Sequence, residues 1–273
     1  MNQLGQPAAQ KTSGWGGVWQ VLQDSTLLRL ISFASIILVW LVFSAFLGPR
    51  IVPGPVETVQ FAVNQFERGA LTFHIWATIQ RVLIAFGIAM LVGIAIGVAM
   101  GASRWIDNLL EGWLVVGLTV PRIMLFVVLY LMLGLNEPAI VIALVLTIMP
   151  NIVVQVREGT QALDHRLIDM AKVYQRTRLA IWRKVIFPQV LPFIIGTARI
   201  SLSIAWRLVV LGELLGRTSG VGYQIQFYFQ MFNMTGILAY GLAMMIILAI
   251  IDLGVMGGLH RLAFRWRPRA GGA

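Results

Sequence analysis

Residues 164–192 read DHRLIDMAKVYQRTRLAIWRKVIFPQVLP, and they form the most charged stretch of a very apolar chain. Apolar side chains recur among its cations at steps of three and four residues, which is typical of an amphipathic helix. Long hydrophobic runs flank the stretch on both sides. Two interpretations follow. The stretch is a cytoplasmic loop that lies on lipid headgroups, or it is a docking helix for a soluble partner.

The composition is that of an integral membrane protein. Of the 273 residues, 58% are hydrophobic and 12% are charged, whereas a soluble domain carries about 25% charged residues. Several charge-free runs reach the roughly 20 residues that a helix needs to cross a bilayer. The net charge of +10 does not indicate nucleic acid as a partner, because the basic residues lie where membrane topology places them.

Six apolar segments predict six transmembrane helices and an all-α integral membrane fold. They are residues 30–47, 82–103, 112–135, 139–156, 188–215 and 236–259. Pro121 and Arg122 interrupt the third segment. With both termini in the cytoplasm, 14 Lys and Arg residues lie on the inner side and 3 on the outer side. This asymmetry supports six spans with cytoplasmic N and C termini.

The predicted spans divide the chain into four parts. We expect a flexible cytoplasmic tail at 1–27, a first transmembrane helix with an outer amphipathic helix at 28–69, a transmembrane domain at 70–260 and a basic cytoplasmic tail at 261–273. The transmembrane domain contains the cytoplasmic loop 157–187.

Three glycines in the second span, Gly93, Gly97 and Gly101, recur every four residues, so one face of that helix is bare backbone. Such a face favours close packing against a helix of the same fold or of a second subunit. Glycine is also common in membrane helices in general, but three glycines in register favour packing.

No motif for catalysis, nucleotide binding or metal binding occurs in the chain. It has no G-x-x-x-x-G-K-[ST], H-E-x-x-H, G-x-S-x-G or C-x-x-C pattern and no cysteine, and its three histidines are far apart. We therefore predict no catalytic residues, no metal site and no cofactor in this chain.

Charged residues inside the predicted spans are the candidates for a translocation pathway, because a charge in the bilayer is costly and usually functional. They are Arg122, Arg199, Arg207 and Glu213. A cation at Arg207 would attract an anionic solute; the alternatives are a snorkelling side chain or a salt bridge to Glu213 of this or of a paired subunit. Arg199 has a structural alternative, in which it pairs with carbonyl groups or with Asp252.

The basic stretch resembles the EAA loop of the membrane-spanning subunits of bacterial ABC importers. That motif has an acid, two Ala, a Gly and an Ile-x-Leu-Pro ending. The corresponding positions here are Asp169, Met170, Ala171, Val185, Phe187 and Pro188. Gln175 stands where the motif has Gly, at the expected turn between two short helices. Trp182 is either an anchor at the membrane surface or a docking contact.

Further stretches are similar to the permease subunits of the nitrate, taurine and aliphatic-sulfonate branch of these importers. They are VPGPVETV at 52–59, ATIQRVLIAF at 77–86, GIAIGVAMGASR at 93–104, ARISLSIAW at 198–206 and GELLGRTSGVGYQI at 212–225. The third span departs from the branch, which usually has a Pro-Pro pair and a further proline, because here Arg122 follows a single Pro121.

The resemblance implies a type I ABC importer transmembrane domain in the bacterial cytoplasmic membrane. Two copies of the permease would form the pathway for a small polar or anionic solute of the sulfonate, taurine or nitrate type. Two ATP-binding cassette subunits, holding ATP and Mg, would dock on the loop, and a soluble binding protein would deliver the solute. The alternative from the residues alone is a membrane channel or scaffold whose basic loop contacts lipid only.

Overall fold

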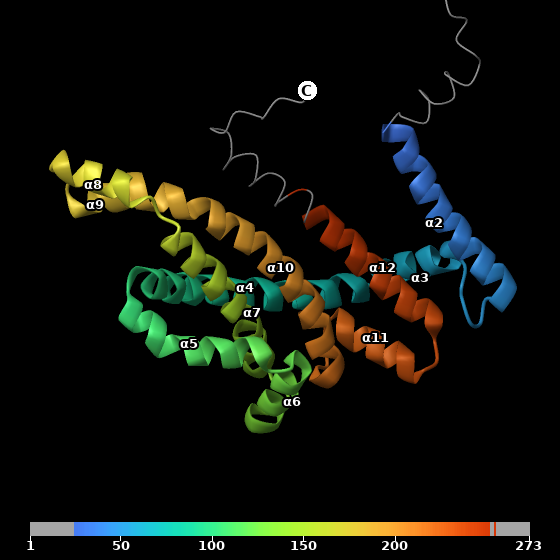
Figure 1. The fold of residues 1–273 in the computed structure, drawn as a ribbon. Coiled ribbons are helices and arrows are strands. Elements are labelled where there is room, and N and C mark those ends of the chain that lie inside the picture. The colour runs from blue at the N-terminus through green and yellow to red at the C-terminus, as the bar shows by residue number, and fades with distance from the viewer. Residues whose placement is uncertain (1–24, 252–253, 255–273) are drawn as a thin grey trace, which may run out of the picture. The chain divides into compact units, whose positions relative to one another are not determined.

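The computed structural model describes residues 25–251 and residue 254 of the chain. Within them every regular element is a helix (Figure 1), which confirms the predicted all-α fold. The predicted tail at 261–273, most of the tail at 1–27, and Asp252 lie outside the described residues. The chain divides between Val59 and Gln60 into two compact units.

The first unit contains α2 and the start of α3, and the second contains the remaining helices. Their bounds are α2 Ser25–Leu47, α3 Pro55–Glu67, α4 Ala70–Ala102, α5 Arg104–Thr119, α6 Arg122–Leu133, α7 Glu137–Gln161, α8 His165–Val173, α9 Arg178–Ile181, the π-helix η1 Trp182–Ile186, α10 Phe187–Gly216, α11 Val221–Gln230 and α12 Met234–Ile250.

Four helical segments in the described part of the chain are long and apolar enough to cross a membrane. They are residues 28–47 of α2, the helices α4 and α7, and the continuous helical segment 178–216. The pair α5 and α6, bent by 97°, is a fifth candidate if it is one span. Helix α12 is apolar but covers 17 residues, and the end of the predicted segment 236–259 lies outside the described residues.

The bend between α5 and α6 follows from the proline that the sequence places there. Val120 has φ −59° and ψ 127°, the extended backbone that a following proline favours. Pro121 has no N–H with which to continue the hydrogen bonds of α5, and Arg122 then begins α6. The predicted interruption of the third span is confirmed.

Helices α4 and α7 pack closely through the glycine face of α4. A Cβ at Gly93 would lie 2.8 Å from Ile152, and a Cβ at Gly97 would lie 2.8 Å from Val156 and 2.9 Å from the carbonyl oxygen of Val153. The predicted close packing is confirmed, and the neighbour is a helix of the same chain. Because backbone meets backbone here, the pair forms a rigid core for the second unit.

The long helix α10 packs on α7, α4 and α6. Near its C-terminal end, the hydroxyl of Tyr130 in α6 donates a 2.8 Å hydrogen bond to the carbonyl of Gly212. The side chain of Phe126 fills the space beside Gly212, so a Cβ there would meet the ring. Figure 1 shows α8 and α9 at one end of α10 and α11 at the other, so α10 links the basic stretch to the opposite end of the unit.

Candidate functional site

The basic stretch folds as two short helices that lead into α10. We call residues 164–188 the basic segment. Asp164 is the N-cap of α8 and accepts a 2.9 Å hydrogen bond from the backbone N–H of Arg166, and Thr177 caps α9 in the same way. The backbone N–H of Asp164 donates to the side chain of Gln189 at 3.0 Å. This bond ties the start of α8 to the first turn of α10.

The expected turn between the two helices is present, although Gln175 takes the place of the motif's glycine. Gln175 has φ +51°. Its N–H bonds to the carbonyl of Lys172 at 2.8 Å, and the N–H of Arg176 bonds to the carbonyl of Ala171 at 3.2 Å. These two bonds form a Schellman motif around a left-handed residue, a conformation that favours glycine and costs other residues about 1 kcal/mol.

The motif positions in α8 differ in what they present to solvent. Asp169 is exposed and forms a 2.8 Å ion pair with Lys172, which lowers the pKa of the Asp169 carboxyl from its usual value. Met170 is also exposed, whereas Ala171 is buried. The acid and Met170 are therefore available to a partner, and Ala171 holds α8 in place.

The motif's ending lies where η1 passes into α10. Trp182 and Phe187 are exposed and their ring centroids lie 5.9 Å apart. Pro188 sits in the first turn of α10, and its ring would clash with the carbonyl four residues earlier in a regular α-helix. The turn before it is the wider π turn of η1, in which the N–H of Phe187 bonds to the carbonyl of Trp182. Val185 and Pro188 also line a cavity of about 950 Å³ against α7 and α8.

The tip of the basic segment exposes large apolar side chains around the turn. Val173 is 81% exposed, Tyr174 71% and Leu179 75%. Such a group of apolar side chains between basic residues is typical of a surface that a partner covers. The tip thus exposes the apolar side chains that a docking helix needs for contact with a partner.

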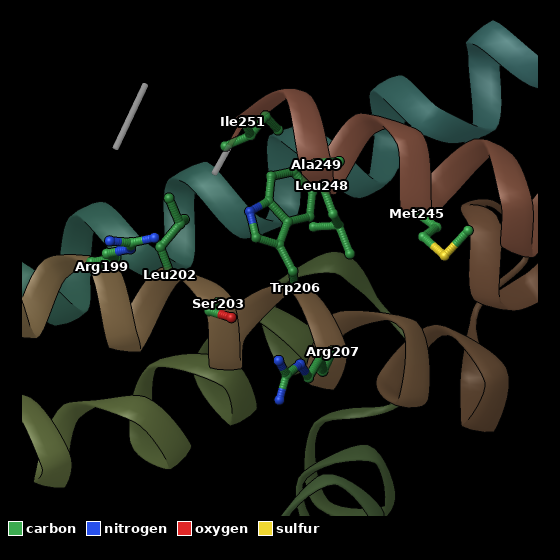
Figure 2. Close-up of a pocket in the computed structure, with 9 residues that line it drawn as sticks. All are labelled: Arg199, Leu202, Ser203, Trp206, Arg207, Met245, Leu248, Ala249 and Ile251. Carbon is green, nitrogen blue, oxygen red and sulfur yellow. The ribbon is translucent and has the colours of Figure 1, made fainter. Parts of the chain in front are cut away.

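The four candidate pathway residues occupy three different places. Arg199 and Arg207 line one pocket between α10 and α12 (Figure 2). Arg122 lines a separate cavity at the bend between α5 and α6, next to Pro150 and Asn151 of α7. Glu213 is fully buried and does not line the pocket of the two arginines. The structure therefore brings together two of the four.

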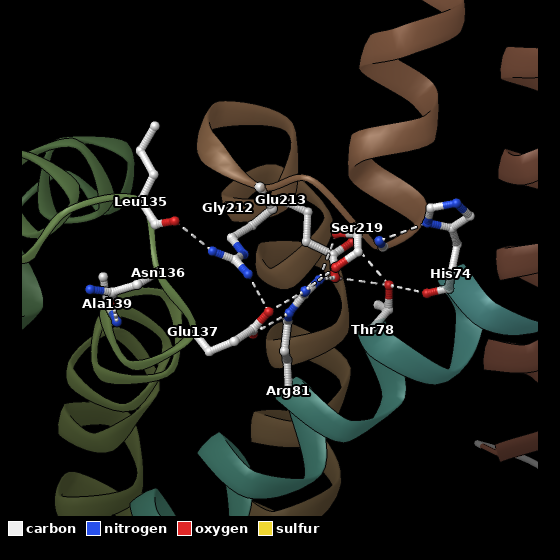
Figure 3. Close-up of polar contacts among 12 residues, drawn as sticks. His74, Thr78, Arg81, Leu135, Asn136, Glu137, Ala139, Gly212, Glu213 and Ser219 are labelled. Atoms are coloured by element: carbon white, nitrogen blue, oxygen red, sulfur yellow. Dashed lines mark hydrogen bonds and ion pairs between the residues drawn. The ribbon is translucent and has the colours of Figure 1, made fainter.

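Glu213 belongs to a buried ion cluster at the end of α10. Arg81 of α4 lies 2.5 Å from the Glu213 carboxylate and 2.7 Å from Glu137, the first residue of α7. Arg217 also pairs with Glu137. The cluster is drawn in Figure 3. With two cations and two carboxylates it is neutral, which is the arrangement that buried charges require. Within the chain, the predicted alternative of an Arg207–Glu213 salt bridge is not formed, because Glu213 pairs with Arg81.

Polar groups from α4 and the α10–α11 turn complete the cluster. The Thr78 hydroxyl oxygen lies 2.9 Å from each Glu213 carboxylate oxygen, and the N–H of Gly222 donates to Glu213 at 2.9 Å. His74 accepts a 3.1 Å hydrogen bond from the N–H of Gly220. Gly220 has φ +109°, and a Cβ there would overlap the Glu213 carboxylate. The turn can approach the acid because it is built on glycine.

The sequence did not predict this cluster, although it contains a signal for it. His74, Thr78 and Arg81 are spaced by four and three residues, so they lie on one face of α4. A polar stripe on an otherwise apolar transmembrane helix indicates a buried polar partner. The partners Glu137 and Glu213 come from helices far along the chain, and spacing alone does not identify them.

Comparison with known proteins gives a family and several relatives. Residues 89–268 match the family described as binding-protein-dependent transport system inner membrane component. A probable ABC transporter permease protein of Brucella melitensis is 33% identical over 73% of this chain and 80% of its own length. A protein of Bacillus subtilis named for aliphatic sulfonates transport is 28% identical over 86% of this chain and 85% of its own. The taurine transport system permease protein of Escherichia coli is 25% identical over 89% and 91%.

The fold is similar to that of a chain in the inward-facing MetNI methionine ABC transporter. The TM-score is 0.62, and the match covers 72% of this chain and 97% of that one. The sequence identity of 19% makes this a similarity of fold.

Proposed function

This chain belongs to the family of binding-protein-dependent transport system inner membrane components, and we propose that it moves a small polar or anionic solute inward through a pathway that two copies of it form. Family membership makes it a multi-pass inner-membrane permease of an ABC importer and a non-enzymatic transmembrane component. It also implies an ATPase and a binding protein as partners. The family match favours the importer over a channel or scaffold.

The ATPase subunits of this importer dock on the basic segment and hold the ATP and Mg²⁺. Binding of ATP closes the ATPase pair, and the motion passes through α8 and α9 into α10. The observation that carries this proposal is the continuity of the segment 178–216, a single helical run of 39 residues. A push on the exposed tip thereby reaches Arg199 and Arg207 in the middle of α10.

The proposed topology has six spans with both termini in the cytoplasm. It is supported by the distribution of Lys and Arg along the sequence and, within the described part of the chain, by the four or five candidate spans together with the apolar helix α12. In this topology the basic segment is cytoplasmic and the ion cluster of Glu213 lies toward the outer side.

The solute class is proposed from the relatives and from the charge of α10. Relatives are named for aliphatic sulfonates and for taurine, and both compounds carry a sulfonate group. Arg199 and Arg207 place two cations on α10 in one pocket. A sulfonate, taurine or nitrate-like solute is the chemistry that such a pathway fits best.

Retention of the ATPase by the tip of the basic segment tests the proposal. The permease is co-expressed with its cognate ATPase and purified through a tag on the permease. Val173→Glu with Leu179→Glu places two charges on the exposed apolar tip. Because a docking contact would bury these charges without partners, we expect ATPase retention to fall about tenfold or more. Ala171 is unsuitable for this test, because it is buried and its replacement would disturb α8 itself.

Val56→Glu is the matched control. Val56 is 65% exposed and lies in the first turn of α3, where an acid favours the helix. This variant should retain the ATPase as wild type does. Undiminished retention by the double variant, or a wild-type permease that never retains its ATPase, would contradict the proposed docking.

A further inference from the structure

We propose that the pocket between α10 and α12 binds a small organic oxyanion, such as a sulfonate or carboxylate with a short alkyl body. We call it the arginine pocket. It is lined by Arg199, Leu202, Ser203, Trp206, Arg207, Met245, Leu248, Ala249 and Ile251. This inference rests on the proposed function, because the pocket would be a binding site for the transported solute on α10, the helix that the ATPase is proposed to move.

The polar residues of the arginine pocket form a stripe along α10. Arg199, Ser203 and Arg207 follow one another at steps of four residues, so each is displaced by about 40° from the one before and the three share a face. Figure 2 shows Arg199 and Arg207 on either side of Ser203. The two arginines are about 12 Å apart along the helix axis. This stripe gives the pocket a polar side with two cations.

The opposite side of the pocket is apolar and comes from α12. Met245 and Leu248 of α12 and its C-cap Ile251 lie along this side, and Trp206 extends from α10 toward α12 (Figure 2). The cavity volume is about 300 Å³, or ten times the roughly 30 Å³ that a water molecule occupies in the liquid. A solute with a few heavy atoms fits, and its alkyl part would contact the α12 side.

Trp206 supplies a donor that the protein leaves unused. Its side chain is 2% exposed, and its indole N–H has no hydrogen-bond partner among the described residues. In Figure 2 the indole nitrogen lies on the ring edge that faces Leu202, another lining residue of the pocket. A buried donor without an acceptor is rare and unfavourable. An oxyanion in the pocket would accept a hydrogen bond from it.

The charge that selects an anion is carried by Arg207. It is exposed at the rim of the pocket, and no hydrogen bond or ion pair joins it to an acidic side chain in the described part of the chain. An arginine in the middle of a candidate span usually faces a partner or a water-filled path. A sulfonate or carboxylate matches the planar fork of a guanidinium better than a neutral solute does.

The combination of an apolar wall with cations favours an organic oxyanion over an inorganic one. Nitrate would pair with Arg207, but it has no alkyl part to contact Met245, Leu248 and Ile251. The cavity at Arg122 is lined by Pro150, Asn151 and Thr147 and is a separate place. The Arg122 cavity is therefore the alternative binding site that the experiment below has to separate from the arginine pocket.

Equilibrium binding of radiolabelled ethanesulfonate tests the arginine pocket. The permease with its retained ATPase is placed in lipid nanodiscs without the binding protein. Arg207→Gln removes the charge, and Trp206→Phe keeps an aromatic ring but removes the indole N–H. We expect ethanesulfonate affinity to fall about tenfold or more in Arg207→Gln and about fivefold in Trp206→Phe. Nitrate should bind more weakly than ethanesulfonate, and ethylammonium should not compete.

Arg50→Gln is the matched control, since Arg50 is an exposed arginine of the first unit, outside the pocket lining. It should bind ethanesulfonate as wild type does. Two results would overturn the inference. One is unchanged affinity in both pocket variants. The other is a loss in Arg122→Gln with none in Arg207→Gln, which would move the site to the bend between α5 and α6.

A lipid headgroup is a second source of an oxyanion, and the nanodisc composition separates it from a solute. In discs of phosphatidylcholine alone, a solute site binds ethanesulfonate with the affinities predicted above. If Arg207→Gln lowers the retention of phosphatidylglycerol in mixed discs but leaves ethanesulfonate affinity unchanged, the pocket holds lipid and the inference fails. Because binding is measured without transport, this outcome leaves the importer function standing, and the retention of the ATPase tests that function separately.

Discussion

Replacing Arg81 with Met tests whether the buried ion cluster holds α4, α7 and α10 together. The Arg81 side chain is 4% exposed and lies 2.5 Å from Glu213 and 2.7 Å from Glu137. It donates five hydrogen bonds, two to Glu137, one to Glu213 and two to Ser219. Methionine keeps most of the length of the side chain and removes all five.

The expected loss of stability is dominated by Glu213. This acid is completely buried and would be left without a cation, a change that costs about 3–5 kcal/mol in measured cases. Glu137 is 52% exposed and keeps Arg217, so its contribution is about 1 kcal/mol or less. Adding Glu213→Gln to Arg81→Met makes the cluster neutral again and should recover about 2 kcal/mol.

Equilibrium unfolding in mixed micelles, followed by tryptophan fluorescence, measures these free energies. Arg50→Met serves as the control, because Arg50 is exposed and its loss should change stability by less than about 0.5 kcal/mol. If Arg81→Met unfolds like this control, the cluster does not hold the helices together. If the double variant is less stable than Arg81→Met alone, the charge argument itself is wrong.

Three further outcomes follow from the packing and the basic segment. In the same unfolding assay, Gly97→Leu should destabilise the chain by about 1–3 kcal/mol, because its Cβ would lie 2.9 Å from a backbone carbonyl oxygen of α7. Gly87→Leu is the control and should leave stability unchanged, because no atom lies within 4 Å of a Cβ at that position. Gln175→Gly should stabilise the turn by up to about 1 kcal/mol, since φ is +51° there, while Gln80→Gly within α4 should destabilise by a similar amount. Lys172 lowers the pKa of Asp169, so this ion pair is present above the ordinary aspartate pKa of about 3.9 and is lost as the pH falls through the lowered value. We therefore expect ATPase retention to stay constant between about pH 6 and pH 8. A change of retention in that range that Asp169→Asn abolishes would contradict this expectation.

The sequence predicted the features that depend on local pattern. Apolar runs that are long enough to cross a bilayer indicate membrane spans. These spans are helical because lipid offers no hydrogen-bond partner to backbone N–H and C=O groups. Pro121 predicted the break between α5 and α6, and the four-residue spacing of Gly93, Gly97 and Gly101 predicted a close helix contact. Each of these is a property of a few consecutive residues, and each is found in the structure.

The basic segment was predicted in part. Its amphipathic pattern and its motif spacing are local, and so they indicated helices and a turn at Gln175. The departure from glycine at that position did not reveal whether the turn forms. The structure shows that it does, through the hydrogen bonds of Gln175 and Arg176 to the end of α8, because a Schellman motif tolerates a strained residue when its other bonds are satisfied.

The tertiary structure alone decided which charges meet. Arg199, Arg207 and Glu213 lie on one helix and share a broad face in the sequence pattern, yet Glu213 pairs with Arg81 from α4, while Arg199 and Arg207 line a separate pocket with residues of α12. The partner of a buried charge is set by helix packing over more than a hundred residues of separation. Helical periodicity gives the direction of a side chain from its own axis, and it contains no information about the neighbouring helix that the side chain will reach.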